Sequence, residues 1–266
     1  MSLLEVLTRD RKERTVLVIC EAFIMEDAPF SSCFEELVPA RPIEHLGKID
    51  MSFNGKLPSP LIINEDGGES GCGGKVWIAG ELLCEYILEK SDKEHLLSHL
   101  FPDGNCNSVL ELGSGTGLVG LCVGLMDQAN EYSDREVYIS DIDQLLGLME
   151  SNIQVNGLDD KVHAEVLWWG NPLPDVFVKK PVDLVLAADC VYLEAAFPLL
   201  EKTLLELTGG ENAPIILMAY KKRRKADKHF FQKIKKNFKI VEIRDFINFD
   251  KYLKQRTHLF QLIREK

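Results

Sequence analysis

A glycine-rich segment near the middle of the chain carries the clearest chemical signal. The apolar run Ser108–Leu112 is followed by glycines at positions 113, 115 and 117 and then by a helical pattern. Glycine lets a backbone turn tightly and lets a ligand approach it closely, and parallel α/β folds bind cofactors where such a strand ends. The segment therefore predicts a loop that holds a nucleotide-containing cofactor.

Two classes of cofactor fit this loop. Gly115, Gly117 and Gly120 satisfy the GxGxxG spacing of dinucleotide-binding proteins. That spacing, however, begins three residues after the strand, where the tight turn should already be complete. The strand also carries Glu111, whose carboxylate would repel a pyrophosphate and attract the ammonium group of a methionine-type cofactor. These features favour S-adenosyl-L-methionine over NAD.

The second predicted strand also ends at a carboxylate. Asp141 directly follows the strand predicted at 136–140. A carboxylate in this position can accept hydrogen bonds from both hydroxyls of a ribose. Because NAD and S-adenosyl-L-methionine both contain ribose, Asp141 does not discriminate between them.

The elements that must position these residues alternate between strand and helix. Strands are predicted at 108–112, 136–140, 163–167, 182–187 and 214–219, with helices at 118–126, 144–155 and 196–207. Such alternation is typical of right-handed βαβ units, which form a parallel sheet covered on both faces. A helix at 226–237 and strands at 239–243 and 257–263 follow, and the last two strands, with no helix predicted between them, should pair antiparallel. The predicted fold is α/β: a Rossmann-like, seven-stranded, mostly parallel sheet with helices on both faces.

The residues before this core predict an N-terminal addition. Strands near 49–53 and 61–63 flank turn-forming residues and read as a β-hairpin, and a helical pattern covers 76–88. We expect residues 1–30 to be a segment of uncertain role and residues 31–266 to form one domain. Within that domain the addition would span 31–95 and the Rossmann-like core 96–266.

Composition and charge limit the possible classes of protein. The 266 residues are 45% hydrophobic and 27% charged, which excludes a disordered chain, and no apolar run approaches the roughly 18 residues of a membrane helix. Seven cysteines form no CxxC pair, so we expect no metal site, no disulfide framework and a reducing, cytoplasmic location. The net charge is −11, yet residues 221–266 hold 16 Lys and Arg against 5 Asp and Glu. This basic region is either a solvated helix or a docking face for an acidic partner.

Several motifs together resemble a known family. ELGSGTG is similar to motif I of class I methyltransferases, and the series Val76-Trp77, Asp141, Trp168-Trp169-Gly170 and Ala188-Asp189-Cys190-Val191-Tyr192 resembles the seven-strand protein-lysine methyltransferases. Within that family the chain most resembles the fungal translation elongation factor 1-alpha lysine methyltransferases. The stretches LVLAADCVYLEAAFPLLEKTLL and ILMAYKKRRKADKHFF carry the closer resemblance, which covers about residues 34–266.

The resemblance implies a role for each matching residue. It implies that Trp77 flanks the cofactor, that Gly113, Ser114 and Gly115 line its methionine part, and that Asp141 holds its ribose. It implies further that Trp169 and Ala188 border the adenosine. Asp189 and Tyr192 match the family's DxxY signature, which lies beside the transferable methyl group. Together with Glu111, these residues form the predicted site.

The site residues also have simpler interpretations. Trp77 is a core residue if the helix is merely amphipathic, Tyr192 is a packed tyrosine if its hydroxyl is satisfied, and Asp189 is a helix cap if its carboxylate serves the helix near 194. As a methyltransferase residue, Asp189 would orient an incoming lysine, because a nearby carboxylate favours the charged amine and suits a base poorly.

The resemblance implies S-adenosyl-L-methionine as cofactor and a protein substrate, translation elongation factor 1-alpha. Methylation of another protein or of nucleic acid is the alternative. The acidic body of the chain argues against nucleic acid.

Overall fold

The computed structural model describes residues 48–66, 71–92, 95–129 and 134–265. All of these residues belong to one compact unit, which spans residues 40–266. The segment predicted at 1–30 lies outside the described residues, and so does its boundary with the domain. Among the described residues, no helix combines the length and the apolar character needed to cross a membrane.

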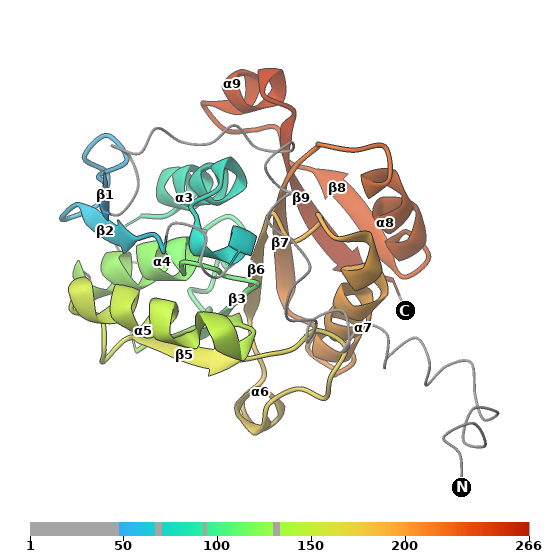
Figure 1. Ribbon diagram of the computed structural model, residues 1–266, viewed down its shortest axis with the longest axis horizontal. Coiled ribbons are helices and arrows are strands. Elements are labelled where there is room, and N and C mark those ends of the chain that lie inside the picture. The colour runs from blue at the N-terminus through green and yellow to red at the C-terminus, as the bar shows by residue number, and fades with distance from the viewer. Residues whose placement is uncertain (1–47, 67–70, 93–94, 130–133, 266) are drawn as a thin grey trace, which may run out of the picture. The chain divides into compact units, whose positions relative to one another are not determined.

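A seven-stranded sheet runs through the middle of this unit (Figure 1). Its strands lie in the order β5-β4-β3-β6-β7-β9-β8. The first five along the chain are parallel, and β9 pairs antiparallel with both β7 and β8. The strands are β3 (Ser108–Leu112), β4 (Glu136–Asp141), β5 (Val162–Val166), β6 (Leu184–Ala188), β7 (Ile215–Lys221), β8 (Phe238–Glu242) and β9 (Thr257–Arg264). The predicted Rossmann-like fold is confirmed, including the antiparallel pair at its end.

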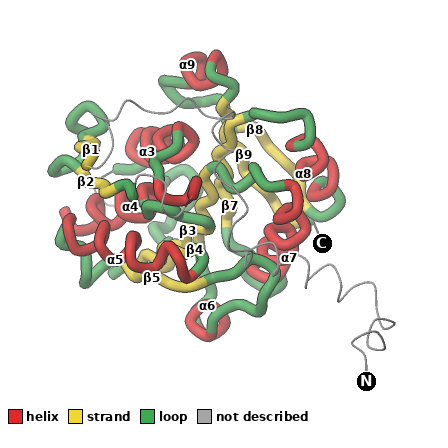
Figure 2. The backbone as a smooth tube through the Cα atoms, viewed as in Figure 1, coloured by secondary structure: helices red, strands yellow, loops and turns green. Residues whose placement is uncertain are grey.

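Helices cover both faces of the sheet because successive strand residues point to opposite sides. Val109 packs in a core with α3, α4 and α5, whereas its neighbour Leu110 packs in a second core with α6, α7 and α8 (Figure 2). The helices of the first face are α3 (Ile78–Lys90), α4 (Leu118–Ala129) and α5 (Leu146–Val155). Those of the second face are α6 (Asp175–Lys179), α7 (Phe197–Leu207) and α8 (Asp227–Ile234). Short 3-10 helices η3 (Asp143–Leu145) and η4 (Glu194–Ala196) precede α5 and α7.

The N-terminal addition is built into the first face. Strands β1 (Lys48–Met51) and β2 (Leu61–Asn64) form the predicted antiparallel hairpin. Asn156, which follows α5, and Asn152 within it accept hydrogen bonds from the backbone of β2, at 2.9 and 2.7 Å. The buried side chains of Leu61 and Ile63 join the core of this face, so the hairpin is bound to the Rossmann-like core by both polar and apolar contacts.

Two short helices differ from the prediction. The prediction that no helix separates the last two strands is wrong, because α9 (Phe249–Lys254) lies between β8 and β9. The five-residue helix α6 was not predicted either. Each is too short to show a repeating apolar period, so its pattern resembles a loop. The pairing of β8 with β9 survives because a six-residue helix fits within the connection of an antiparallel pair.

Candidate active site

The predicted functional residues gather where the parallel strands end. β3, β4, β6 and β7 end at Leu112, Asp141, Ala188 and Lys221. After β3 the chain turns toward β4 and β5, and after β6 it continues toward β7, so the strand order reverses between β3 and β6. Open α/β sheets bind their ligands at such a switch point.

Gly113 and Gly115 of the loop after β3 must be glycine for steric reasons. Gly113 and Gly115 have φ angles of +58° and +56°, a conformation that side chains disfavour. A Cβ atom on Gly113 would lie 2.6 Å from the ring of Trp169, and one on Gly115 would lie 2.5 Å from the carbonyl oxygen of Gly73. The loop is thus tightly enclosed by Trp169 on one side and by η2 (Gly71–Gly74) on the other.

Glu111, in β3, anchors the end of this loop through the start of α4. Its side chain is 2% exposed, and its Oε2 accepts a 2.7 Å hydrogen bond from the backbone N–H of Gly120. Burial raises the pKa of Glu111 to about 8, although backbone hydrogen bonds from Gly120 and Val119 oppose the shift. A carboxyl group that is protonated at neutral pH offers no charge to an ammonium group. These contacts indicate a loop anchor, and the predicted contact with the cofactor gains no support from them.

Replacing Glu111 with glutamine should flatten the pH dependence of stability between pH 6 and pH 8. In this range the folded carboxyl holds a proton that the unfolded one has lost, so wild-type stability should fall as pH rises, by up to about 1.4 kcal/mol per unit. Glutamine keeps an acceptor for Gly120 and cannot ionise. Urea unfolding of both proteins at pH 6, 7 and 8 measures the difference, and identical slopes would contradict the assigned protonation.

Asp141 holds the other side of the glycine loop. Its Oδ2 accepts a hydrogen bond from Gly115 N–H and its Oδ1 from Ile142 N–H, each at 2.8 Å. Burial raises the pKa of Asp141 to about 6 despite these two bonds. A carboxylate has about four acceptor positions. Since two donors from the described residues reach Asp141, two acceptor positions remain for other donors.

Ser114, between the two glycines, turns its side chain inward. It is buried, and its hydroxyl lies 3.0 Å from the sulfur of Met149. Its backbone N–H donates to the carbonyl of Ser140 at 3.0 Å, which joins the loop to β4. Any contact of Ser114 with a ligand would therefore involve its backbone.

Asp189 forms an ion pair that sequence reasoning missed. It lies directly after β6 with a φ angle of +59° and is 6% exposed. Its two carboxylate oxygens accept bonds from Nη1 and Nη2 of Arg223, each at 2.7 Å, and Oδ1 also accepts from Lys221 N–H at 3.1 Å. The helix-cap interpretation of Asp189 is wrong, because η4 has Leu193 at its N-cap and the carboxylate faces β7.

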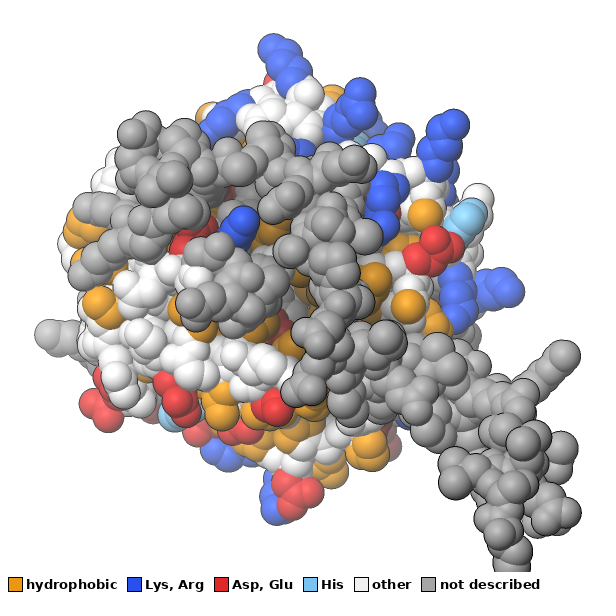
Figure 3. Space-filling model, in the orientation of Figure 1, with side chains coloured by type: hydrophobic (Ala, Val, Ile, Leu, Met, Phe, Trp, Pro, Cys, Tyr) orange, Lys and Arg blue, Asp and Glu red, His pale blue; other side chains and the backbone are white. Residues whose placement is uncertain are grey.

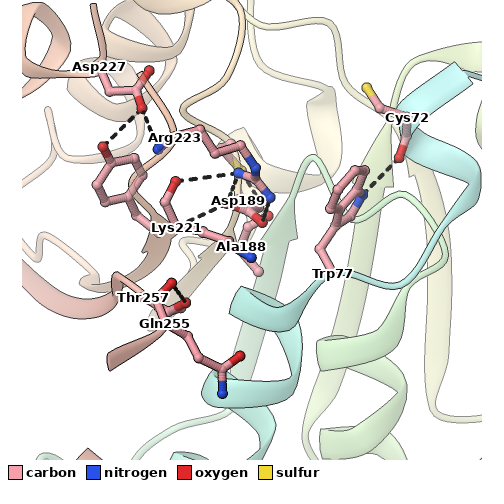
Figure 4. A network of polar contacts seen from close by, with 11 residues as sticks. Cys72, Trp77, Ala188, Asp189, Lys221, Arg223, Asp227, Gln255 and Thr257 are labelled. Carbon is pink, nitrogen blue, oxygen red and sulfur yellow. Dashed lines mark hydrogen bonds and ion pairs between the residues drawn. The ribbon is translucent and has the colours of Figure 1, made fainter. Parts of the chain in front are cut away.

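Arg223 connects Asp189 to Trp77 (Figure 4). The guanidinium carbon lies 5.0 Å from the centre of the Trp77 ring, and Trp77 Nε1–H donates to the carbonyl of Cys72 at 2.8 Å. Trp77 lies at the N-cap of α3 and is half-buried, so it is not a core residue of that helix. The interpretation of Arg223 as part of a solvated or docking face is also wrong, because its side chain is only 15% exposed.

Tyr192, in the loop after β6, lies beside Cys72 of η2. It is half-buried and shares a side-chain hydrogen bond with Cys72. Burial raises the pKa of both groups, and for Tyr192 nearby Cys72 and Asp141 add to the effect. Both groups are therefore neutral at physiological pH. Cys72 gave no signal in the sequence beyond being the one thiol in a glycine-rich loop.

Trp169 and Ala188 lie near the same edge. Trp169 is half-buried against the second core, with its ring beside Gly113. Ala188 is the last residue of β6 and pairs with Ala219 of β7. The sheet thus brings Gly113, Asp141, Trp169, Ala188 and Asp189 to one end of the strands, as predicted, and adds Arg223 and Cys72.

Comparisons with known proteins agree on one class of enzyme. A family described as lysine methyltransferase matches residues 56–237. The chain is 62% identical to the protein-lysine N-methyltransferase EFM6 of Saccharomyces cerevisiae, over 87% of this chain and 97% of that protein. It is 31% identical to the protein N-lysine methyltransferase METTL21A of Xenopus tropicalis, over 68% of this chain and 75% of that protein. It is also 31% identical to the EEF1A lysine methyltransferase 3 of the same frog, over 63% and 66% of the two chains.

Proposed function

The chain belongs to the lysine methyltransferase family and is a protein-lysine N-methyltransferase, and on this premise we propose that it transfers a methyl group from S-adenosyl-L-methionine to a lysine of translation elongation factor 1-alpha. The relative named EEF1A lysine methyltransferase 3 supports this substrate. The observation that carries the chemistry is a buried carboxylate, Asp189, at the same sheet edge as the glycine loop and Asp141.

The residues at this edge fit the proposed cofactor. Asp141 retains acceptor positions suited to ribose hydroxyls, and the positive φ angles of Gly113 and Gly115 suit a loop that closely surrounds a ligand. In this proposal Asp141 holds the ribose, the backbone of residues 113–115 lines the methionine part, and Trp77 flanks the cofactor. Trp169 and Ala188 border the adenosine. When bound, the cofactor supplies the electrophilic methyl group.

The protein must supply an uncharged amine in the right orientation. A free lysine has a pKa near 10.4 and is almost fully protonated at neutral pH. Asp189 orients the lysine nitrogen by accepting one of its N–H groups, and Tyr192 adds a second hydrogen-bonding group on the same side. The ring of Trp77 limits the directions from which the lysine side chain can reach Asp189. Holding a nucleophile in line in this way provides much of the rate enhancement in a displacement reaction.

A labelling assay with nuclease-treated and untreated extract tests whether the substrate is a protein or a nucleic acid. The protein is incubated with methyl-labelled S-adenosyl-L-methionine and an extract of cells that lack it, with and without nuclease. Label in a protein band that survives nuclease treatment supports the proposal, whereas label lost with nuclease supports the alternative, a nucleic-acid substrate.

An exposed basic patch supports docking of a protein substrate. The patch consists of Lys222 and Lys225 in the loop after β7 and Lys228 in α8, all exposed. In Figure 3, Lys and Arg side chains gather over the side of the molecule that carries α8 and α9. The loop begins where β7 ends, so the patch lies at the active-site edge of the sheet.

Reversing the charge of Lys222 and Lys225 to glutamate should raise the KM for the protein substrate at least about twofold, since each exposed charge pair contributes ~0.2–1 kcal/mol. The salt dependence of KM should weaken at the same time. Steady-state kinetics at two salt concentrations measure both effects. Lys179 and Lys180 provide the matched control, because Lys180 pairs with Glu136 at the opposite edge of the sheet. If the Lys222/Lys225 and Lys179/Lys180 double variants have equal kinetics, the basic patch is only a solvated surface and does not dock the substrate.

A further inference from the structure

Arg223 is held in place by the loop that carries it. The backbone N–H groups of Arg223 and Arg224 donate to Oδ2 of Asp227, at 3.1 and 3.0 Å, and the hydroxyl of Tyr220 donates to the same oxygen at 3.0 Å. Asp227 is buried at the start of α8. This clamp fixes the loop after β7, and the guanidinium of Arg223 reaches Asp189 from a fixed backbone (Figure 4).

The ion pair leaves Asp189 with little acceptor capacity. Among the described residues, three hydrogen bonds reach its carboxylate: two from Arg223 and one from Lys221 N–H. Of about four acceptor positions, one therefore remains, on Oδ2. An ammonium group brings three donors and a charge, whereas a neutral amine can donate one N–H and keep its lone pair free. The remaining position matches the neutral amine.

We propose that Arg223 is a positioning residue that cancels the charge of Asp189, so that the target lysine is bound as a neutral amine ready to react. The inference rests on the proposed function, because it concerns the lysine that Asp189 orients. A lone carboxylate would favour the charged amine, and a paired one accepts a hydrogen bond without that electrostatic preference. The ring of Trp77 lies against the guanidinium, 5.0 Å from its carbon, while Nη1 and Nη2 point to Asp189.

The thiol and phenol groups around the ion pair are neutral, and Asp227 has a cation of its own in Arg224, whose Nε lies 3.7 Å from Oδ1 of Asp227. The titratable groups that act on it are Cys72 of η2, Cys190 and Tyr192 after β6, Tyr220 of β7 and Asp227 of α8. Burial raises the pKa of Cys72, Cys190, Tyr192 and Tyr220, so these groups are neutral. Burial disfavours the charged form of Arg223, but Asp189 and Asp227 outweigh it and the pKa of Arg223 is raised. Asp141, which acts on Cys72 and Tyr192, is bonded to the glycine loop.

The pH dependence of kcat/KM tests this proposal, with elongation factor 1-alpha from cells lacking the enzyme as substrate. In Arg223→Gln the uncompensated carboxylate should hold the lysine charged, so the acid limb should move to higher pH by about one unit or more. Arg223→Lys keeps the charge and should retain a profile close to the wild type. In the double variant Asp189→Asn with Arg223→Gln, the acid limb of the kcat/KM profile should return toward its wild-type pH. Neither residue 189 nor residue 223 then carries a charge that could hold the lysine protonated.

Arg135 provides the matched control for lost stability. It forms a buried ion pair with Asp127 in another part of the fold, so Arg135→Gln removes the same kind of pair without touching the site. Its melting temperature should fall and its pH profile should stay unchanged. If Arg223→Gln behaves like this control, Arg223 is only structural and the proposal fails. If the wild type does not methylate the factor at any pH, the proposed function fails, and this inference fails with it.

Proton release gives a second readout that does not depend on turnover. Calorimetry of the substrate binding to the enzyme with S-adenosylhomocysteine, in two buffers of different ionisation enthalpy, counts the protons released. At pH 7.5 the wild type should release about one proton, as a lysine with a pKa near 10.4 becomes neutral on binding. Arg223→Gln should release markedly less. Equal release by the two proteins would overturn the proposal.

Discussion

Replacing Asp189 with asparagine should lower kcat for lysine methylation by at least about tenfold, or roughly 1.4 kcal/mol in activation free energy. Asparagine has nearly the same size as aspartate, but its NH2 group replaces one of the two oxygens that accept from Arg223. The bidentate contact is therefore lost. The lysine then loses its fixed acceptor. Because orientation acts mainly on the barrier, KM for the cofactor should change little. Steady-state kinetics of the purified variant measure both parameters.

The same substitution should also lower stability. It leaves the guanidinium of Arg223 without its ionic partner, and breaking a buried pair costs about 3–5 kcal/mol. The loss should be smaller here because Arg223 is 15% exposed and keeps its contact with Trp77. Asp127→Asn, which breaks the buried pair with Arg135, should lower the melting temperature while kcat is retained. An Asp189→Asn variant that turns over at the wild-type rate would show that the carboxylate only anchors the loop after β7.

Replacing Asp141 with alanine should weaken binding of S-adenosyl-L-methionine by about 1.5–3 kcal/mol for each charged hydrogen bond to the ribose that is lost. Part of the loss should come from the glycine loop, because Asp141 also holds the N–H of Gly115. Calorimetric titration of the folded variant measures the affinity.

Asp143, exposed two residues further along in η3, provides the control, and Asp143→Ala should bind the cofactor as the wild type does. Unchanged affinity in Asp141→Ala, or tight binding of NAD by the wild type, would contradict the assignment of the cofactor.

The parts of the site that the sequence predicted are those encoded locally. Gly113 and Asp141 each lie at the end of an apolar strand, and strand ends in a parallel sheet meet at one edge, so the proximity of these two residues follows from the order of the elements along the chain. The two faces of the sheet follow in the same way, because Val109 and Leu110 alternate as core residues of opposite sides.

The parts that the sequence did not predict depend on contacts between distant residues. Arg223 lies within a run of basic residues and reads as a surface charge, yet it pairs with a carboxylate 34 positions earlier in the chain. Cys72 lies in a glycine-rich loop, and its contact with Tyr192 depends on how η2 folds over the site. Glu111 lies next to the glycine loop, but its side chain points toward the start of α4. Local spacing carries no information about these directions.

The most direct test of the central claim is mass spectrometry of translation elongation factor 1-alpha from cells that lack this protein. The account predicts that one lysine of the factor loses its methylation, and that wild-type protein restores it whereas the Asp189→Asn variant does not. Methylation of the factor that remains complete in the deleted cells would contradict the proposed substrate.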